Sequence, residues 1–207
     1  MTRTLTESRS RTPWAITLLL AAAWPLSFAS AQQRTGVDSE QGLDVYLSED
    51  ALQALYARTL AVGQVEDARV SVGFFINEAR DLIGIGDASV NVIDPTRRRH
   101  WGLAVGPRAY GALLSVEDQD IFAIALGGKA SYYFTDDRDT AVSLSMYYAP
   151  DIVTFGTADN VTDVSVEFET RLTERMRIYV GYRTFEIDLT VDREVDDGLH
   201  LGLRGNF

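Results

Sequence analysis

Apolar and polar residues alternate along most of the chain after residue 41. In the segment 67–77, Val70, Val72 and Phe74 alternate with polar or small residues, and Phe207 ends the last segment of this kind. Alternation with a period of two predicts β-strands that have one apolar and one polar face. The segments with this pattern are 42–47, 51–60, 67–77, 82–92, 101–114, 121–134, 141–149, 161–171, 176–189 and 198–207.

The ninth predicted strand changes phase along its length. Ile178 and Val180 lie on its apolar face, whereas Phe185 and Ile187 fall on the opposite face. A β-bulge near Thr184, or the point at which the strand leaves a membrane, explains the change. The longest predicted loop covers 150–160, and the last one covers 192–197.

Alternation alone does not tell which face is inside. A lipocalin-like soluble barrel places its apolar face inside, whereas a membrane barrel places it outside, against lipid. Here the polar face mixes Gly, Ala and Ser with Arg and Glu, which is typical of a packed polar lumen, and the strands have about 10 residues, which matches a tilted span. We therefore predict an all-β fold, a transmembrane antiparallel up-and-down β-barrel over residues 42–207, with about ten strands and eight as the alternative.

The aromatic residues favour ten strands. With both chain ends on the periplasmic side, strand parity places the aromatic residues in two layers, as expected for the two girdles of such barrels. The predicted periplasmic layer contains Trp101, Phe134, Phe168 and Phe207. The predicted outer layer contains Phe74, Phe122, Tyr148 and Phe185.

The first 31 residues have the features of a cleaved secretory signal. A basic start is followed by an apolar stretch over 14–28 and by small residues at 29–31. We predict cleavage after Ala31 and a periplasmic tail over 32–41. A buried N-terminal helix is the alternative, which Pro25 disfavours. No later segment has the run of about 20 apolar residues that a transmembrane helix needs.

The composition argues against several classes of function. Of the 207 residues, 19 are basic and 30 are acidic, and removal of the signal with its three arginines and one glutamate leaves 16 and 29, a net charge of −13. Such acidity opposes binding to nucleic acid. The chain has no cysteine and two histidines, which excludes thiol catalysis, cysteine-ligated metals and multi-histidine sites. We expect no metal and no cofactor.

Charged residues avoid the apolar face, where a basic side chain at mid-membrane would cost about 2–4 kcal/mol. Antiparallel pairing across the turn at 173–175 predicts Glu169 opposite Arg177 and Asp163 opposite Arg183. Large side chains fill a narrow barrel, so we predict a plugged lumen crossed by ion pairs, with a thin ion-selective path as the alternative. The residues predicted to form this lumen charge network are Arg69, Arg108, Lys129, Asp163, Glu167, Glu169, Arg177, Arg183, His200 and Arg204. The basic cluster 97–99 is interpreted as a solvated periplasmic turn.

The sequence contains no evident catalytic constellation. Serine hydrolysis needs a serine, a histidine and a carboxylate in contact. His100 and His200 lack the closely following serine of outer-membrane lipid A deacylases. The acidic pairs 136–137 and 196–197 have no histidine predicted to face them, unlike the His-Asp couple of omptin-like proteases. We therefore predict no catalytic residues and no enzymatic activity.

Short motifs in the second half of the chain carry a resemblance to a known family. They are Tyr148-Ala149-Pro150, Phe155-Gly156, Val180-Gly181-Tyr182-Arg183, and Gly202-Leu203-Arg204 through Phe207. On these motifs the chain resembles the YfaZ family of outer-membrane proteins, most strongly from residue 101 onward. The resemblance implies an outer-membrane β-barrel and supplies no catalytic residues.

The last strand also resembles the signal read by the barrel-assembly machinery. Leu201, Leu203 and Phe207 form this assembly signal, and Gly205 occupies a position that usually holds a bulky residue. The expected partners are outer-membrane lipid and, during insertion, the assembly machinery and periplasmic chaperones, with the barrel a monomer. We expect a structural or surface-interaction role. A narrow pore for ions or small solutes is the second interpretation, and a lipid-modifying enzyme the third.

Overall fold

The computed structural model describes residues 40–62, 66–92, 100–114, 119–156, 158–188 and 193–207. The chain divides into two units, Met1–Gly36 and Val37–Phe207, and all of these residues belong to the second. The predicted signal peptide, the predicted tail up to residue 39 and the basic cluster 97–99 lie outside the described residues. Within the described ranges, no helix is both long and apolar enough to cross a membrane.

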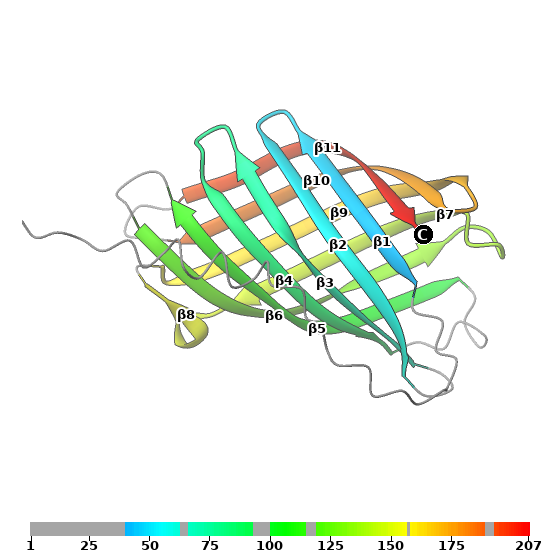
Figure 1. The fold of residues 1–207 in the computed structure, drawn as a ribbon, viewed down its shortest axis with the longest axis horizontal. Coiled ribbons are helices and arrows are strands. Elements are labelled where there is room, and N and C mark those ends of the chain that lie inside the picture. Colours follow the sequence, from blue (N-terminus) through cyan, green and yellow to red (C-terminus); the bar gives the residue numbers. More distant parts are fainter. Residues whose placement is uncertain (1–39, 63–65, 93–99, 115–118, 157, 189–192) are drawn as a thin grey trace, which may run out of the picture. The chain divides into compact units, whose positions relative to one another are not determined.

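The described residues form a closed antiparallel barrel of ten strands (Figure 1). Each strand pairs with the next one along the barrel, and the first strand pairs with the last. The strands are β1 (Gln41–Ser48), β2 (Ala51–Val62), β3 (Glu66–Asn77), β4 (Leu82–Asn91), β5 (Trp101–Leu114), β6 (Gln119–Tyr133), β7 (Thr140–Ala149), β9 (Asn160–Thr173), β10 (Met176–Asp188) and β11 (Arg193–Asn206). This confirms the predicted up-and-down barrel with ten strands.

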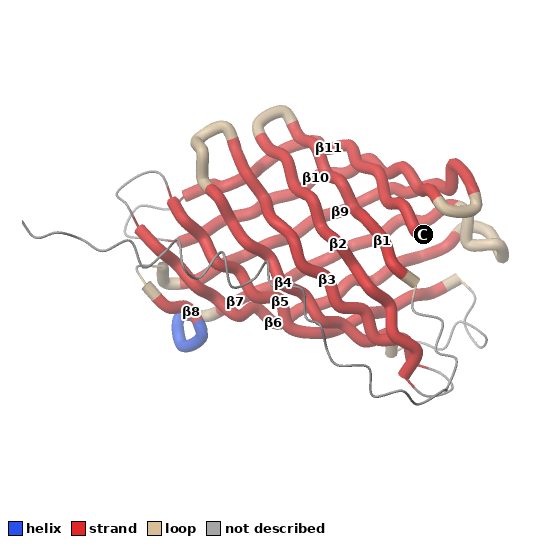
Figure 2. Tube along the Cα trace, in the orientation of Figure 1, coloured by secondary structure: helices blue, strands red, loops and turns tan. Residues whose placement is uncertain are grey.

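The long loop between β7 and β9 carries two short elements. A single 3₁₀ turn, η1 (Asp151–Val153), precedes the two-residue strand β8 (Thr154–Phe155), as Figure 2 shows. β8 pairs with β6 at Phe122 and Ala123, beyond the point where β7 ends. The loop thus covers part of the edge that the longer β6 would otherwise leave open.

The two ends of the barrel are named here by the chain termini. The terminal end carries the start of β1 and the end of β11, and the distal end carries the β1–β2 and β3–β4 turns (Figure 1). At the terminal end, the backbone N–H of Phe207 donates to the carbonyl oxygen of Gln41 at 2.9 Å. The last residue therefore takes part in closing the barrel.

The last strand is longer than predicted. β11 begins at Arg193, so the predicted loop over 192–197 is wrong for its described residues. Asp196 opposes Phe185 in the register, and its carboxylate accepts hydrogen bonds from the hydroxyls of Tyr46 and Ser48. An acidic sequence that reads as a solvated turn is thus a strand whose inward carboxylate has internal partners.

The outer surface of the barrel is apolar. Each of the ten strands exposes large hydrophobic side chains, such as Leu43 on β1, Val72 on β3, Leu144 on β7 and Leu201 on β11. A soluble monomer rarely exposes contiguous apolar surface on this scale, whereas a closed barrel with an apolar wall satisfies its backbone within lipid. The barrel is therefore of the transmembrane type, with its polar face inward.

A cluster of buried apolar side chains lies in the distal half of the lumen. Phe185 packs edge-on against Phe75, with 5.9 Å between ring centroids, and its ring is tilted against that of Tyr110 at 5.3 Å. We call this cluster the distal plug. Its members are Phe75, Ile83, Tyr110, Ala112, Ile121, Ala123, Val161, Phe185, Ile187 and Val195, all of them buried.

The distal plug overturns one predicted girdle residue. Phe185 is 0% exposed and points inward, so its assignment to the outer aromatic girdle is wrong. The predicted phase change of β10 is absent, because Arg183, Phe185 and Ile187 are all buried on the lumen face. The register irregularity lies between Phe185 and Glu186 in the pairing with β11. What changes along β10 is the polarity of the lumen, not the direction of the side chains.

Candidate functional site

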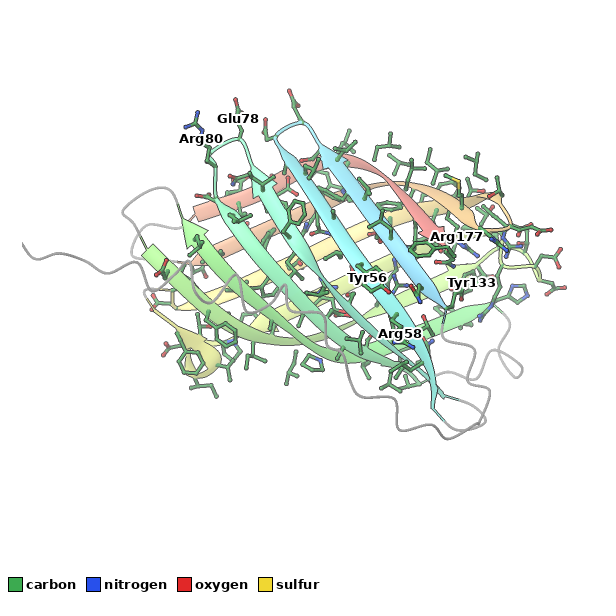
Figure 3. The ribbon with its side chains drawn as sticks, viewed as in Figure 1. Tyr56, Arg58, Glu78, Arg80, Tyr133 and Arg177 are labelled. Atoms are coloured by element: carbon green, nitrogen blue, oxygen red, sulfur yellow. The ribbon has the colours of Figure 1, made fainter. Side chains whose placement is uncertain are left out.

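A polar cavity of about 370 Å³ occupies the lumen on the terminal side of the distal plug. All ten residues of the predicted lumen charge network line it, whereas Phe75, Tyr110 and Phe185 of the distal plug do not. Figure 3 shows two lining residues, Tyr133 and Arg177, toward the terminal end, far from the distal β3–β4 turn that carries Glu78 and Arg80. The cavity is therefore the candidate site.

Its inner boundary is an ion-pair layer centred on Asp163, which is 4% exposed. Arg183 donates from Nε and Nη2 to the two carboxylate oxygens, each at 2.9 Å. Arg108 donates to the same carboxylate at 3.1 Å, and the Tyr110 hydroxyl donates at 2.7 Å. Arg108 also pairs with Asp87 at 3.4 Å. We call these groups the inner ion-pair layer; bidentate geometry of this kind fixes both partners.

A second layer lies nearer the terminal end and is centred on Arg204. Its guanidinium contacts Asp44 at 2.7 Å and Glu169 at 2.8 Å. Arg177 shares Glu169 at 3.2 Å. The Tyr179 hydroxyl donates to Asp44 at 2.6 Å. This terminal ion-pair layer links the neighbouring strands β1, β11, β10 and β9 on their lumen face.

Lys129 completes the pairs on the other side of the cavity, where its ammonium lies 2.6 Å from Glu167. The remaining wall there consists of short hydroxyl side chains. Ser131 contacts Ser143 at 2.9 Å, and Ser145 contacts Ser165 at 2.6 Å. Because these side chains are short, they leave the space that the cavity occupies.

Two residues of the predicted network take no part in the ion pairs. Among the described residues, Arg69 forms no side-chain ion pair or hydrogen bond, although it lines the cavity. His200 is 3% exposed, and neither of its ring nitrogens has a hydrogen-bond partner. Its ring lies 4.5 Å from Tyr46 and 5.9 Å from Tyr179, between centroids.

The predicted register of β9 and β10 is wrong by two residues, yet the predicted ion pairs form. Arg177 opposes Arg171 and Arg183 opposes Ser165, and the register shifts by one residue between Met176 and Arg177. The long arginine side chains reach diagonally to Glu169 and to Asp163. Diagonal neighbours on one face of a twisted sheet lie within reach of such side chains.

Two glycines on the lumen face make room for the central rings. A Cβ atom on Gly202 would lie 2.1 Å from the ring of Tyr179, and one on Gly181 would lie 2.7 Å from Nε2 of His200. Gly198 on the same strand as Gly202 has no atom within 4 Å of that position.

We expect Gly202→Ala to destabilise the barrel by about 1–3 kcal/mol, because Tyr179 must move and lose its hydrogen bond to Asp44. Urea unfolding in lipid vesicles measures the change. Gly198→Ala is the matched control and should have little effect. Equal losses in the two variants would show that Tyr179 does not depend on this contact.

The other predicted girdle residues lie on the outer surface. Trp101, Phe134 and Phe168 are exposed toward the terminal end, and Phe134 packs near Phe168 with centroids 6.5 Å apart. Phe207 is exposed at the end of the chain. The remaining three residues, Phe74, Phe122 and Tyr148, are exposed on the distal half. The assembly-signal residues Leu201 and Leu203 also point outward.

The histidines do not form a hydrolytic triad among the described residues. His200 contacts no hydroxyl or carboxylate through its ring nitrogens. His100 does face an acidic pair, contrary to the prediction, with Nε2 at 3.5 Å from Asp136. Its Nδ1 lies 2.9 Å from the Tyr133 carbonyl oxygen, and both His100 and Asp136 are exposed. The described residues contain no cluster of three or more potential metal ligands.

Several residues of the site were not predicted. Asp44, Tyr46, Asp87, Tyr110 and Tyr179 all point into the lumen. The available signal was strand parity: Asp44 shares a face with Tyr46, and Tyr110 shares one with Arg108.

A known protein family matches the C-terminal part of the chain. The family model described as YfaZ precursor matches residues 98–207, which is more than half of the chain. A search of curated proteins found no match.

Among solved structures, the chain is similar to outer-membrane barrels. The outer membrane protease OmpT from Escherichia coli is 10% identical, with a TM-score of 0.47 over 86% of this chain and 99% of that one. The outer membrane channel DcaP of Acinetobacter baumannii is 12% identical, with a TM-score of 0.41 over 79% of this chain and 54% of that one. The OmpT outer-membrane protein of Vibrio cholerae is 12% identical, with a TM-score of 0.42 over 80% and 64%.

The chain spans about half to two thirds of the length of the DcaP and Vibrio OmpT chains. The family match covers β5 to β11, which include the C-terminal strands of the inner and terminal ion-pair layers. This chain therefore belongs to the YfaZ family, and it is an outer-membrane β-barrel protein.

Proposed function

We propose that the protein is a non-enzymatic outer-membrane barrel with a structural or surface-interaction role, whose lumen is closed to ion flow. The distal plug is the observation that carries this proposal. Phe75, Ile83 and Phe185 are each 0% exposed, which indicates close packing across the lumen at the distal end. Ions do not cross a dry apolar barrier at useful rates, because dehydration is too costly.

The inner ion-pair layer adds to the closure. The Arg183 guanidinium lies 4.9 Å from the ring centroid of Phe185 and 5.4 Å from that of Phe75. The plug and the charged layer are thus in contact, and Asp163 fixes the guanidinium at the boundary. This arrangement supports a cavity that is open toward the terminal end only.

The distal loop supports the surface-interaction part of the proposal. Ile152 on η1 is 84% exposed, and Phe155 on β8 is 57% exposed. Phe155 packs near Phe122 of the outer wall, at 6.1 Å between centroids. Large apolar side chains at this position suit contact with lipid or with another surface molecule.

Planar-bilayer recording of the refolded protein tests the closure. We expect no steady unitary current from the wild-type barrel. A reproducible unitary conductance would contradict the proposal and favour the narrow pore. A comparison of lipid A species tests the non-enzymatic part of the proposal. The lipid A is taken from cells that produce the wild-type protein and from cells that produce the His100→Ala variant. Any lipid A product that disappears in the variant would favour an enzyme.

We also propose that export uses a signal peptide cleaved after Ala31, and that the terminal end faces the periplasm. The basic start, short apolar stretch and small residues before Gln32 support this. N-terminal sequencing of the protein from purified outer membranes should yield Gln32 first. An uncleaved Met1 would contradict cleavage.

A further inference from the structure

We propose that the lumen cavity is a binding site for a small hydroxylated organic anion, whose carboxylate or phosphate group is held by Arg69. The direction of entry, from the terminal end, rests on the proposed closure of the distal end. The binding site itself does not depend on that closure.

The described lining of the cavity has one more basic side chain than it has carboxylates. Its described lining contains five carboxylates and six basic side chains, counting histidine as neutral. Every carboxylate has a basic partner: Asp44 with Arg204, Asp87 with Arg108, Asp163 with Arg183, Glu167 with Lys129, and Glu169 with Arg177. Arg69 is the basic residue left over. An uncompensated charge in a partly enclosed site is unfavourable, so an anion in the cavity would relieve it.

Arg69 on β3 has hydroxyl side chains around it. Its neighbours in the register are Thr59 on β2 and Ser89 on β4, and Ser71 follows it on the same face. All of these residues line the cavity. Three hydroxyls around a guanidinium that has no ion-pair partner among the described residues provide donors for an oxyanion, and the fork geometry of arginine matches carboxylate and phosphate.

Other charges near Arg69 do not replace such a ligand. Asp44, Asp87 and Glu169 attract it electrostatically, and Arg204 repels it. The three carboxylates are already bonded to other basic groups, and none contacts Arg69 within the part of the chain that is described.

The imidazole of His200 is a second polar group of the cavity that has no hydrogen-bond partner. Both ring nitrogens of His200 are buried and unpartnered, and the ring lines the same cavity. Leaving these atoms unsatisfied is costly, so a ligand toward which the ring could turn would be favoured.

The size of the cavity and the hydroxyl side chains of its wall suit a small organic ligand. A cavity of about 370 Å³ falls within the range of small-molecule sites and exceeds the needs of a bare inorganic ion. In each contacting serine pair, Ser131 with Ser143 and Ser145 with Ser165, one hydroxyl donates to the other, and Ser131, Ser145 and Ser165 line the cavity. A ligand with hydroxyl groups would use these positions.

Binding to the refolded barrel in detergent micelles, measured by isothermal titration calorimetry, tests the proposal. The probes are gluconate and glucose 6-phosphate, with glucose as the uncharged control. We expect at least one of the two anions to bind and glucose to bind more weakly by roughly 10-fold or more. Absence of binding by both anions at millimolar concentration, or equal binding of glucose, would overturn the proposal.

Two variants locate the site. Arg69→Gln should weaken anion binding roughly 10- to 100-fold. Arg171→Gln, a control at the terminal rim where Arg171 pairs with Asp139, should not change it. Arg69→Gln should also unfold at a higher urea concentration than the wild type without ligand, because it removes a charge that has no ion pair within the described part of the chain. Wild-type affinity in Arg69→Gln would overturn the role of Arg69.

The outcomes separate this proposal from the proposed closure. Anion binding together with a steady conductance would refute the closure and leave the site intact. No anion binding together with no conductance would refute the site and leave the closure intact.

Discussion

Asp163→Asn is expected to destabilise the folded barrel by about 3–5 kcal/mol, because it removes the carboxylate that Arg183 and Arg108 share. Asparagine keeps the size of the side chain but not its charge, so the guanidinium of Arg183, which is 5% exposed, loses its ion-pair partner. Urea unfolding in lipid vesicles, followed by the fluorescence of Trp101, measures the loss.

The matched control is Asp151→Asn. Asp151 is exposed on the distal loop and begins η1, so the same chemical change there should alter stability by no more than about 0.5 kcal/mol. Equal stability of the Asp163→Asn variant and the wild type would show that the inner ion-pair layer does not hold the lumen together.

Phe75→Ala is expected to destabilise the barrel by about 3–5 kcal/mol, because it leaves a cavity in the distal plug. Phe75 is 0% exposed and contacts Phe185, whereas its neighbour Phe74 is 45% exposed on the outer wall. Phe74→Ala removes the same atoms from the lipid face, where lipid chains fill the space, and should cost less. The same unfolding assay compares the two variants.

Bilayer recordings of these variants give a second measure of the plug. Phe75→Ala should produce flickering current that Phe74→Ala lacks, since only the first thins the apolar barrier. A larger stability loss for Phe74→Ala than for Phe75→Ala would mean that the assignment of inner and outer faces along β3 is reversed.

Much of the fold followed from the alternation of apolar and polar residues. Strand parity placed Val70, Val72 and Phe74 on one face of β3, and the structure exposes all three outside. Charged residues such as Arg183 and Arg204 fell on the inner face because lipid excludes them.

The prediction of which side chains face inward was wrong where the lumen changes from polar to apolar. The prediction treated the inner face as polar along its whole length, so Phe185 was assigned to lipid and β10 to a phase change. A period of two shows that side chains alternate between the two faces, but it does not show which face points inward. At Phe185 and Ile187 of the distal plug, the inward positions are apolar, and the alternation itself continues. Only the positions of the neighbouring strands, which bring Phe75 and Tyr110 to the same point, show why those residues face inward.

The candidate site was predicted as a set of residues but not as a set of contacts. The ion pairs of Arg177 and Arg183 depend on diagonal reach and on a register shift next to Met176, which residue spacing does not reveal. The isolation of Arg69 could not be predicted either. It depends on which basic group reaches each carboxylate, and Asp44, for example, is bound by Arg204 from the far end of the chain.

Spin labels along β3 test the central claim, that the apolar face meets lipid and the polar face lines the lumen. The chain has no cysteine, so single cysteines at Val70, Ser71 and Val72 can each carry a nitroxide. The structure exposes Val70 and Val72 and buries Ser71. In liposomes, oxygen should relax the labels at 70 and 72 strongly and the label at 71 weakly. Strong relaxation by a water-soluble nickel chelate at 70 and 72, with oxygen favouring 71, would contradict the account.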